Sequence, residues 1–218
     1  MTHAWMPGAW RIRAANDGGP LKGGAPRVVW LTLGTSSRKV SVQSAAARLL
    51  AEQRPCHLVW DPATGEIAQL VSILRAARAL GAAERLDWSE RAACPRNANT
   101  EGRLCVQIGV LAHHTDPFTA GPLAGIGTIV SWLDSWGVAR QWPSGQPAPA
   151  RDHRHVRSRA LWARGGHFGA SQVPGCENTS PGHNDIDRLT GTHGLSIHTT
   201  PLAPAATATA AAAVAIPV

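Results

Sequence analysis

The sequence contains no tyrosine and only two phenylalanines, so its nine tryptophans carry almost all of the aromatic content. A buried indole must donate its N–H to an acceptor, because an unpaired polar group in a core is costly. The sequence therefore predicts that buried tryptophans are tied to hydrogen-bond acceptors. We expect tryptophan to mark both the core and any ligand groove.

Lysine is nearly absent as well. Of the 21 cationic side chains, only Lys22 and Lys39 are lysines, and the formal net charge is +7. A positive charge of this size favours an anionic partner such as nucleic acid, lipid head groups or an acidic wall polymer, but it does not choose among them.

Long apolar runs and closely spaced cysteines are also missing. No stretch approaches the roughly 20 apolar residues of a membrane span, and segment 1–20 has no apolar core like that of a signal peptide. A cytoplasmic protein without a membrane span is therefore expected. The four cysteines form no Cys-x-x-Cys pair, which argues against a zinc knuckle or a dense disulfide framework and predicts reduced thiols.

The length of 218 residues suits one globular domain with poorly ordered ends. Segment 1–26 is rich in Gly, Pro and Ala without a sustained period, which predicts an irregular arm on the surface. The domain itself is predicted for residues 27–189. Segment 190–218 decays into Thr, Ala and Pro and predicts a disordered tail.

Within residues 27–189 the hydrophobic patterns predict an α/β domain with a mixed central β-sheet flanked by helices. The expected strands are 28–33, a hairpin of 57–60 and 66–71 joined by a turn over 61–65, a central strand within 103–112, and a last strand over 160–163. The expected helices are 41–53, 73–80 and 123–136, the last ended by Gly137. Residues 81–100 and the Pro-rich 141–149 predict loops.

Four stretches are the most informative part of the sequence, because the order in which they occur and the distances between them match those of a known family. They are Arg27 to Trp30, His57 to Leu70, Ala124 to Gly137, and Gly165 to Pro174. Together they resemble the type 2 N-acetylmuramoyl-L-alanine amidases, the zinc family that includes phage lysins and peptidoglycan recognition proteins, and in particular its actinobacterial branch. The resemblance covers about residues 27 to 189.

The resemblance implies a zinc ion in a groove on one face of the sheet, bound by two histidines and an Asp or Cys. Such a zinc polarises an amide carbonyl and generates hydroxide near neutral pH. The family's zinc-binding positions are matched here by Leu31, Ala170 and Ser180, and none of these side chains is a good zinc ligand. The family's catalytic Glu, in a Gln-Ile-Glu stretch, is matched by Gly109 of Gln107-Ile-Gly109.

The sequence differs from the family at these four positions, but the apolar residues around them still match it. The sequence therefore predicts a catalytically degenerate amidase-like protein, without metal or cofactor, that binds peptidoglycan or muropeptide fragments. Recognition without cleavage needs only ground-state complementarity. No catalytic residue is assigned, and the candidates for lining a ligand groove are His57, Asn99, His167 and Gln172. A phage-associated or non-classically exported context would bring such a binder to the wall.

Two alternatives remain open. An active zinc amidase would need relocated ligands, drawn from His113, His114, His167, Cys176 and His183. A basic nucleic-acid-binding protein would use the run Arg151 to Arg159, since phosphate contacts dominate such affinity. Because no base-reading helix or stacking module is visible, nucleic acid is the less favoured partner.

Overall fold

The computed structural model describes residues 2–36, 38–80, 97–114, 117–149, 152, 155–176, 178 and 180–192. In chain order its elements are β1 (Trp10–Arg11), β2 (Arg27–Thr32), α1 (Val42–Ala51), β3 (Leu58–Trp60), β4 (Ile67–Gln69), η2 (Ala98–Thr100), β5 (Cys105–Val110), η3 (Phe118–Ala120), α2 (Ile126–Ser135), α3 (Arg159–Ala163), β6 (Gly166–Gly169), η4 (Ala170–Gln172) and α4 (Ile186–Thr190). Within these ranges no helix combines the length and the apolar character that crossing a bilayer requires.

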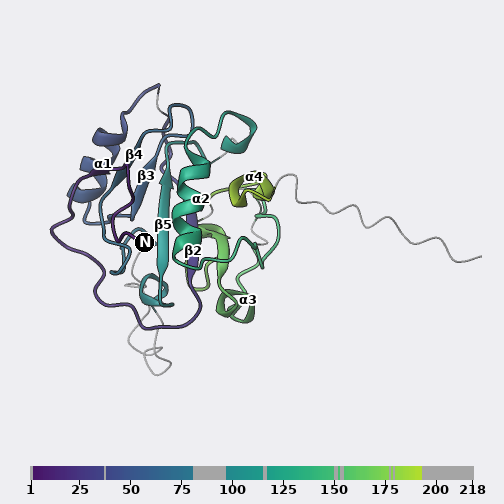
Figure 1. Ribbon diagram of the computed structural model, residues 1–218. Coiled ribbons are helices and arrows are strands. Elements are labelled where there is room, and N and C mark those ends of the chain that lie inside the picture. Colours follow the sequence, from purple (N-terminus) through teal and green to yellow (C-terminus); the bar gives the residue numbers. More distant parts are fainter. Residues whose placement is uncertain are drawn as a thin grey trace, which may run out of the picture.

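The six strands form one mixed sheet in the order β1-β4-β3-β5-β2-β6, which confirms the predicted fold class of a single α/β domain (Figure 1). Strands β3, β5, β2 and β6 run parallel to one another, and β4 pairs antiparallel with β3 in the predicted hairpin. The carboxyl ends of the four parallel strands therefore lie along one edge. We call it the carboxyl edge, the side on which open α/β sheets usually bind ligands.

Each face of the sheet has its own hydrophobic core because side chains alternate along β2. Val29 and Leu31 pack on the face covered by α1, the α1 face, whereas Val28 and Trp30 pack on the face covered by α2, the α2 face. In Figure 1, α2 lies in front of β2, with β5 visible beside it. This alternation decides which functional candidates can meet.

The predicted helices over 41–53 and 123–136 are confirmed as α1 and α2. The first helix begins after Ser41, whose hydroxyl accepts a hydrogen bond from the Ser44 backbone N–H at 3.2 Å. It buries Ala45 and Leu49 against the sheet. The chain leaves α2 at Gly137, whose φ of 72° is the left-handed conformation that glycine adopts without strain.

The predicted helix over 73–80 is wrong, since this segment has no regular secondary structure. Several of its backbone N–H groups bond to residues far away in the sequence, and not to carbonyls one turn earlier as in a helix. The N–H groups of Ala76, Arg78 and Ala79 donate to the Gly19 carbonyl at 3.0 Å, the Pro55 carbonyl at 2.8 Å and the Gln107 side chain at 2.8 Å. We call residues 73–80 the strap; Ala77, Ala79 and Leu80 pack on the α1 face, whereas Ile73 is buried in the α2-face core.

The predicted last strand over 160–163 is also wrong. Ser158 caps a short helix there, α3, by accepting from the Leu161 N–H, and Trp162 is buried against Phe168. The last strand is instead the glycine-rich β6. A Cβ at Gly166 would lie 2.6 Å from the Gln141 carbonyl oxygen, so a close approach of two backbones explains the glycine at position 166.

The two ends of the chain were predicted to be irregular. Residues 10–11 of the arm form β1, which pairs with β4 and extends the sheet, while the division at residue 26 stays a prediction. The predicted tail lies outside the described residues except for 190–192, which end α4. The predicted loop over 81–100 is described only from residue 97, where η2 begins after Asn97.

The expectation that buried indoles find acceptors is confirmed. The indole N–H groups of five tryptophans donate to His167 Nδ1, the carbonyls of Ala124 and His3, Gln172 Oε1 and Glu101 Oε2; the donors are Trp30, Trp60, Trp132, Trp142 and Trp162 in that order. Most of these bonds join parts of the chain that are far apart in sequence. They therefore fix tertiary structure as well as satisfying the indoles.

Candidate functional site

The three positions that match the family's zinc ligands converge at the carboxyl edge. Leu31 lies in β2, and Ala170 follows Gly169 of β6, which pairs with Trp30. The hydroxyl of Ser180 accepts from the Thr32 N–H at 3.2 Å, and the Ser180 carbonyl accepts from the Ser171 N–H at 2.8 Å. The fold therefore gathers these positions even though they are far apart in sequence.

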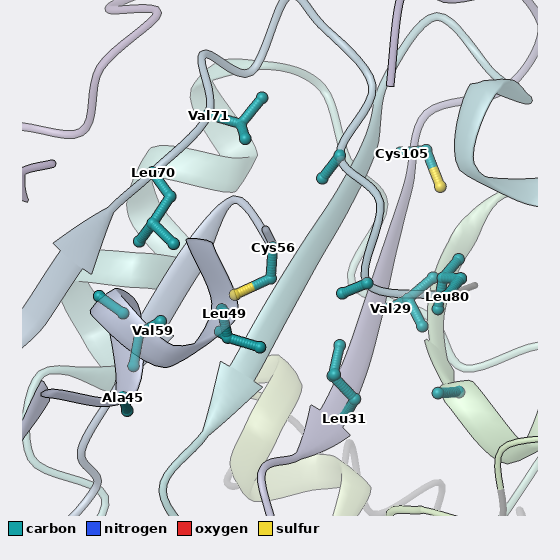
Figure 2. Packing of buried hydrophobic residues seen from close by; sticks show 14 of the residues in the cluster. Val29, Leu31, Ala45, Leu49, Cys56, Val59, Leu70, Val71, Leu80 and Cys105 are labelled. Carbon is teal, nitrogen blue, oxygen red and sulfur yellow. The ribbon is translucent and has the colours of Figure 1, made fainter. Parts of the chain in front are cut away.

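What stands at these positions does not fit a zinc ion. Leu31, Ala170 and Ser180 are 5%, 0% and 5% exposed, and the first two belong to the α1-face core together with Leu80. Figure 2 shows Leu31 near the end of β2 and Leu80 beside Val29, within one apolar cluster. Zinc requires nitrogen, sulfur or carboxylate donors, and an alkyl cluster with one buried hydroxyl does not supply them.

Neighbouring side chains fill the space beside Gly109, the position that the resemblance matches to a catalytic Glu. Gly109 pairs with Leu31, and a Cβ added at Gly109 would lie 3.0 Å from Leu33 Cδ2 and 3.1 Å from Cys56 Sγ. Burial raises the pKa of the Cys56 thiol to about 12, so this sulfur is a neutral thiol that packs as an apolar group. A carboxylate side chain at position 109 would have to displace both neighbours.

His57 lies at the start of β3 and is fully buried. Its Nδ1 accepts from the Gln107 N–H at 3.0 Å, so Nε2 carries the proton and lies 2.9 Å from the Arg75 carbonyl. Desolvation lowers the pKa of His57 to about 4, opposed by the bond to Arg75 and by the charge of Asp17. Both ring nitrogens are thus engaged in holding the strap to the sheet.

Asn99 joins the same α1-face network through Gln107, a residue that sequence reasoning passed over. The Gln107 amide donates to Asn99 Oδ1 at 2.8 Å, while Gln107 Oε1 accepts from the Ala79 N–H. The Leu80 N–H also reaches Asn99 Oδ1, at 3.4 Å. The only available signal was a glutamine in the middle of an apolar strand, which requires buried partners.

We expect Gln107→Leu to destabilise the fold by roughly 3 kcal/mol, since it removes the acceptor of the buried Ala79 N–H and a donor to Asn99 Oδ1. Urea unfolding measures this difference as a lower midpoint. The matched control is Gln43→Leu on α1, where the glutamine is only half-buried. Equal midpoints for the two variants would contradict the role of Gln107.

His167 lies on the opposite face from His57, because it pairs with Val28 of the α2 face. Its Nδ1 accepts from Trp30 Nε1 at 3.1 Å, and its ring stacks against Trp30 and Trp142 with centroids 6.1 and 6.2 Å away. Desolvation lowers its pKa to about 4. The imidazole is therefore neutral at pH 7.

Gln172 is buried in the turn after β6. Its Oε1 accepts from Trp142 Nε1 at 2.7 Å and from the Gly169 N–H at 3.0 Å, and its Nε2 donates to the Gly145 carbonyl at 2.9 Å. The structure thus brings His57 and Asn99 near Gln107 and places His167 across the sheet. All four predicted groove residues are almost fully buried, and each makes at least one internal hydrogen bond.

The residues considered for a relocated zinc site do not gather. Cys176 is buried and donates to the Leu80 carbonyl at 3.4 Å, while His114 and His183 are exposed and His113 is half-buried. Among the described residues, no group of three or more His, Cys, Asp or Glu side chains is placed to hold a metal ion.

The basic run Arg151 to Arg159 is only partly described. Arg157 donates to the Ser171 carbonyl at 3.0 Å, and Arg159 forms an ion pair with Glu101 at 2.8 Å. Residues 151, 153 and 154 lie outside the described set. The two arginines that can be placed are therefore engaged with the protein itself.

The whole chain was compared with known protein families, curated sequences and solved structures. No family model and no curated protein sequence matches the chain. Two solved structures are similar. Staphylococcus aureus hydrolase AmiA in complex with its ligand has a TM-score of 0.44 and 8% identity, over 75% of this chain and 65% of that one, less than two thirds of its length. A selenomethionine derivative of AmpD has a TM-score of 0.47 and 13% identity, over 88% and 98% of the two chains.

Proposed function

We propose that this chain is a catalytically degenerate amidase-like protein that binds peptidoglycan fragments without hydrolysing them. The observation that carries the proposal is the convergence of Leu31, Ala170 and Ser180 at the carboxyl edge, at the positions where the resemblance implies zinc ligands. Side chains that cannot bind a metal stand together at that edge. On this proposal the protein needs no zinc.

The packing around Gly109 supports the same proposal. Leu33 and Cys56 lie within 3.1 Å of the Cβ that a catalytic Glu would need there. Hydrolysis requires groups that stabilise the transition state, whereas binding requires only a complementary surface. The proposal therefore assigns ligand contacts to exposed groups along the carboxyl edge. His114 follows β5, His183 follows Ser180, and both can donate hydrogen bonds to peptide carbonyls.

The test uses the full chain incubated with zinc, freed of unbound metal and mixed with purified muropeptides. We expect substoichiometric zinc, no release of stem peptide, and a binding isotherm that weakens at least fivefold in His114→Ala/His183→Ala. The control Glu52→Gln changes an exposed residue at the far end of α1 and should bind as the wild type. Released stem peptide, or stoichiometric zinc that His167→Ala abolishes, would establish the active alternative. Absence of binding would refute the proposal.

A further inference from the structure

The N-terminal arm is held firmly to the domain, which the sequence did not indicate. Gln69, almost fully buried, accepts from the Met6 N–H at 2.5 Å and donates to the Ala4 carbonyl at 3.1 Å. The Ile73 N–H reaches the same carbonyl at 3.2 Å, and Trp132 Nε1 donates to the His3 carbonyl at 2.9 Å. Side chains on this arm therefore project from a fixed backbone.

The arm carries two tryptophans next to two arginines. Trp10 is 58% exposed, the most exposed of the large apolar side chains in the described ranges. The guanidinium carbons of Arg11 and Arg13 lie 4.7 and 5.6 Å from the centroid of the same Trp5 ring. Both arginines are exposed, and within the described residues neither has a carboxylate within 4.0 Å.

The two guanidinium groups carry the same charge beside one indole ring, so their positive potentials add there. An anionic group that contacts both arginines would be attracted by both charges. Because stacking on Trp5 already restricts the two side chains, less conformational entropy is lost when they bind an anion. The pair is therefore suited to a phosphate group, which accepts several N–H donors at once.

Trp10 adds a second requirement, since an exposed indole offers a face for stacking a flat ring. Trp10 and Arg11 are successive residues of the edge strand β1 and project to opposite sides of it. A stiff duplex cannot contact both sides of a strand, whereas a flexible single strand can cross the edge. Stacking platforms combined with cationic groups are typical of proteins that bind single-stranded nucleic acid.

We propose that the arm surface formed by Trp5, Trp10, Arg11 and Arg13 binds single-stranded nucleic acid, with phosphates on the arginine pair and a base on Trp10. This activity is separate from the carboxyl edge and does not depend on the proposed function. It also differs from the basic run Arg151 to Arg159, where the arginines that can be placed bond to the protein.

The experiment measures fluorescence anisotropy of a labelled oligothymidylate of about 15 nucleotides against the full chain at several salt concentrations. Arg11→Gln/Arg13→Gln should weaken binding at least tenfold and reduce the slope of log K against log salt by about 1.4, since each single-strand phosphate contact contributes roughly 0.7. Trp10→Ala should weaken binding about tenfold. The control Arg38→Gln/Lys39→Gln removes the same charge elsewhere and should change affinity less than threefold.

Four outcomes would overturn the proposal. They are no binding at about 0.1 M salt, equal losses in the arm and control variants, a duplex bound as well as the single strand, or heparin competing fully while Trp10→Ala has no effect. Because the substituted side chains are exposed, unfolding curves of the variants should match the wild type. Muropeptide binding by Arg11→Gln/Arg13→Gln should be unchanged, which separates a failure here from a failure of the proposed function.

Discussion

Acidification from pH 7 to 4.5 should lower the free energy of unfolding by about 5 kcal/mol, because His57 and His167 are both buried as neutral imidazoles. Their pKa values are lowered from 6.5 to about 4 in the folded protein, mainly by desolvation. The unfolded chain takes up these protons below about pH 6.5, whereas the folded chain resists them until about pH 4. The stabilisation is therefore complete above pH 6.5 and is lost as the pH falls toward 4.

Each histidine accounts for about half of this loss, roughly 2.5 kcal/mol. A total near 5 kcal/mol is comparable with the whole stability of many domains, so we expect a sharp acid transition. Urea unfolding at the two pH values measures it for the wild type and for His57→Gln, His167→Gln and the double variant. The exposed His183→Gln is the control. A double variant that keeps the full pH dependence would show that these imidazoles are not the cause.

Placing a glutamate at position 109 should strongly destabilise the fold. We expect Gly109→Glu to lose at least 4 kcal/mol, because its Cβ would lie 3.0 Å from Leu33 Cδ2 and 3.1 Å from Cys56 Sγ. The carboxylate would also enter the α1-face core without a partner to offset its desolvation. The urea midpoint measures the loss.

Gly109→Ala adds a methyl group without charge and should cost about 1 to 2 kcal/mol, so it separates crowding from the buried charge. Gly109→Glu should also cost less stability when it is introduced into a Leu33→Ala variant than when it is introduced into the wild type, because Leu33→Ala opens the space beside position 109. A Gly109→Glu variant as stable as the wild type would mean that this space is open. It would contradict the claim that Leu33 and Cys56 fill the space beside Gly109.

The strap is held against the sheet by hydrogen bonds to buried side chains. Ala79 and Leu80 are held by the amides of Gln107 and Asn99, and Arg75 is held by His57. His57 and Asn99, two of the four groups that sequence reasoning offered to a ligand, therefore bond to the chain's own backbone. These hydrogen bonds are used in tertiary structure.

Much of the fold could be predicted because its signals are local. The apolar run at 28–33, the hairpin around residues 61–65, the helical pattern over 41–53 and the spacing from Leu123 to Trp136 each specify their element within a few residues. The positions of Leu31, Ala170 and Ser180 were also evident from the sequence. Their convergence was an expectation that came only from the resemblance.

The sequence by itself determined which side chains are available, namely indoles that need acceptors and the alkyl or hydroxyl groups of Leu31, Ala170 and Ser180. Only the tertiary structure decided that residues 73–80 pack without forming a helix, that a glycine-rich segment is the last strand, and that His57 and His167 face opposite sides. In each case the deciding partner is distant in the chain, such as Gln107 for Ala79 or Gln141 for Gly166. The local sequence pattern does not predict such partners, because the energy of a buried hydrogen bond or a close contact depends on which segments the fold brings together.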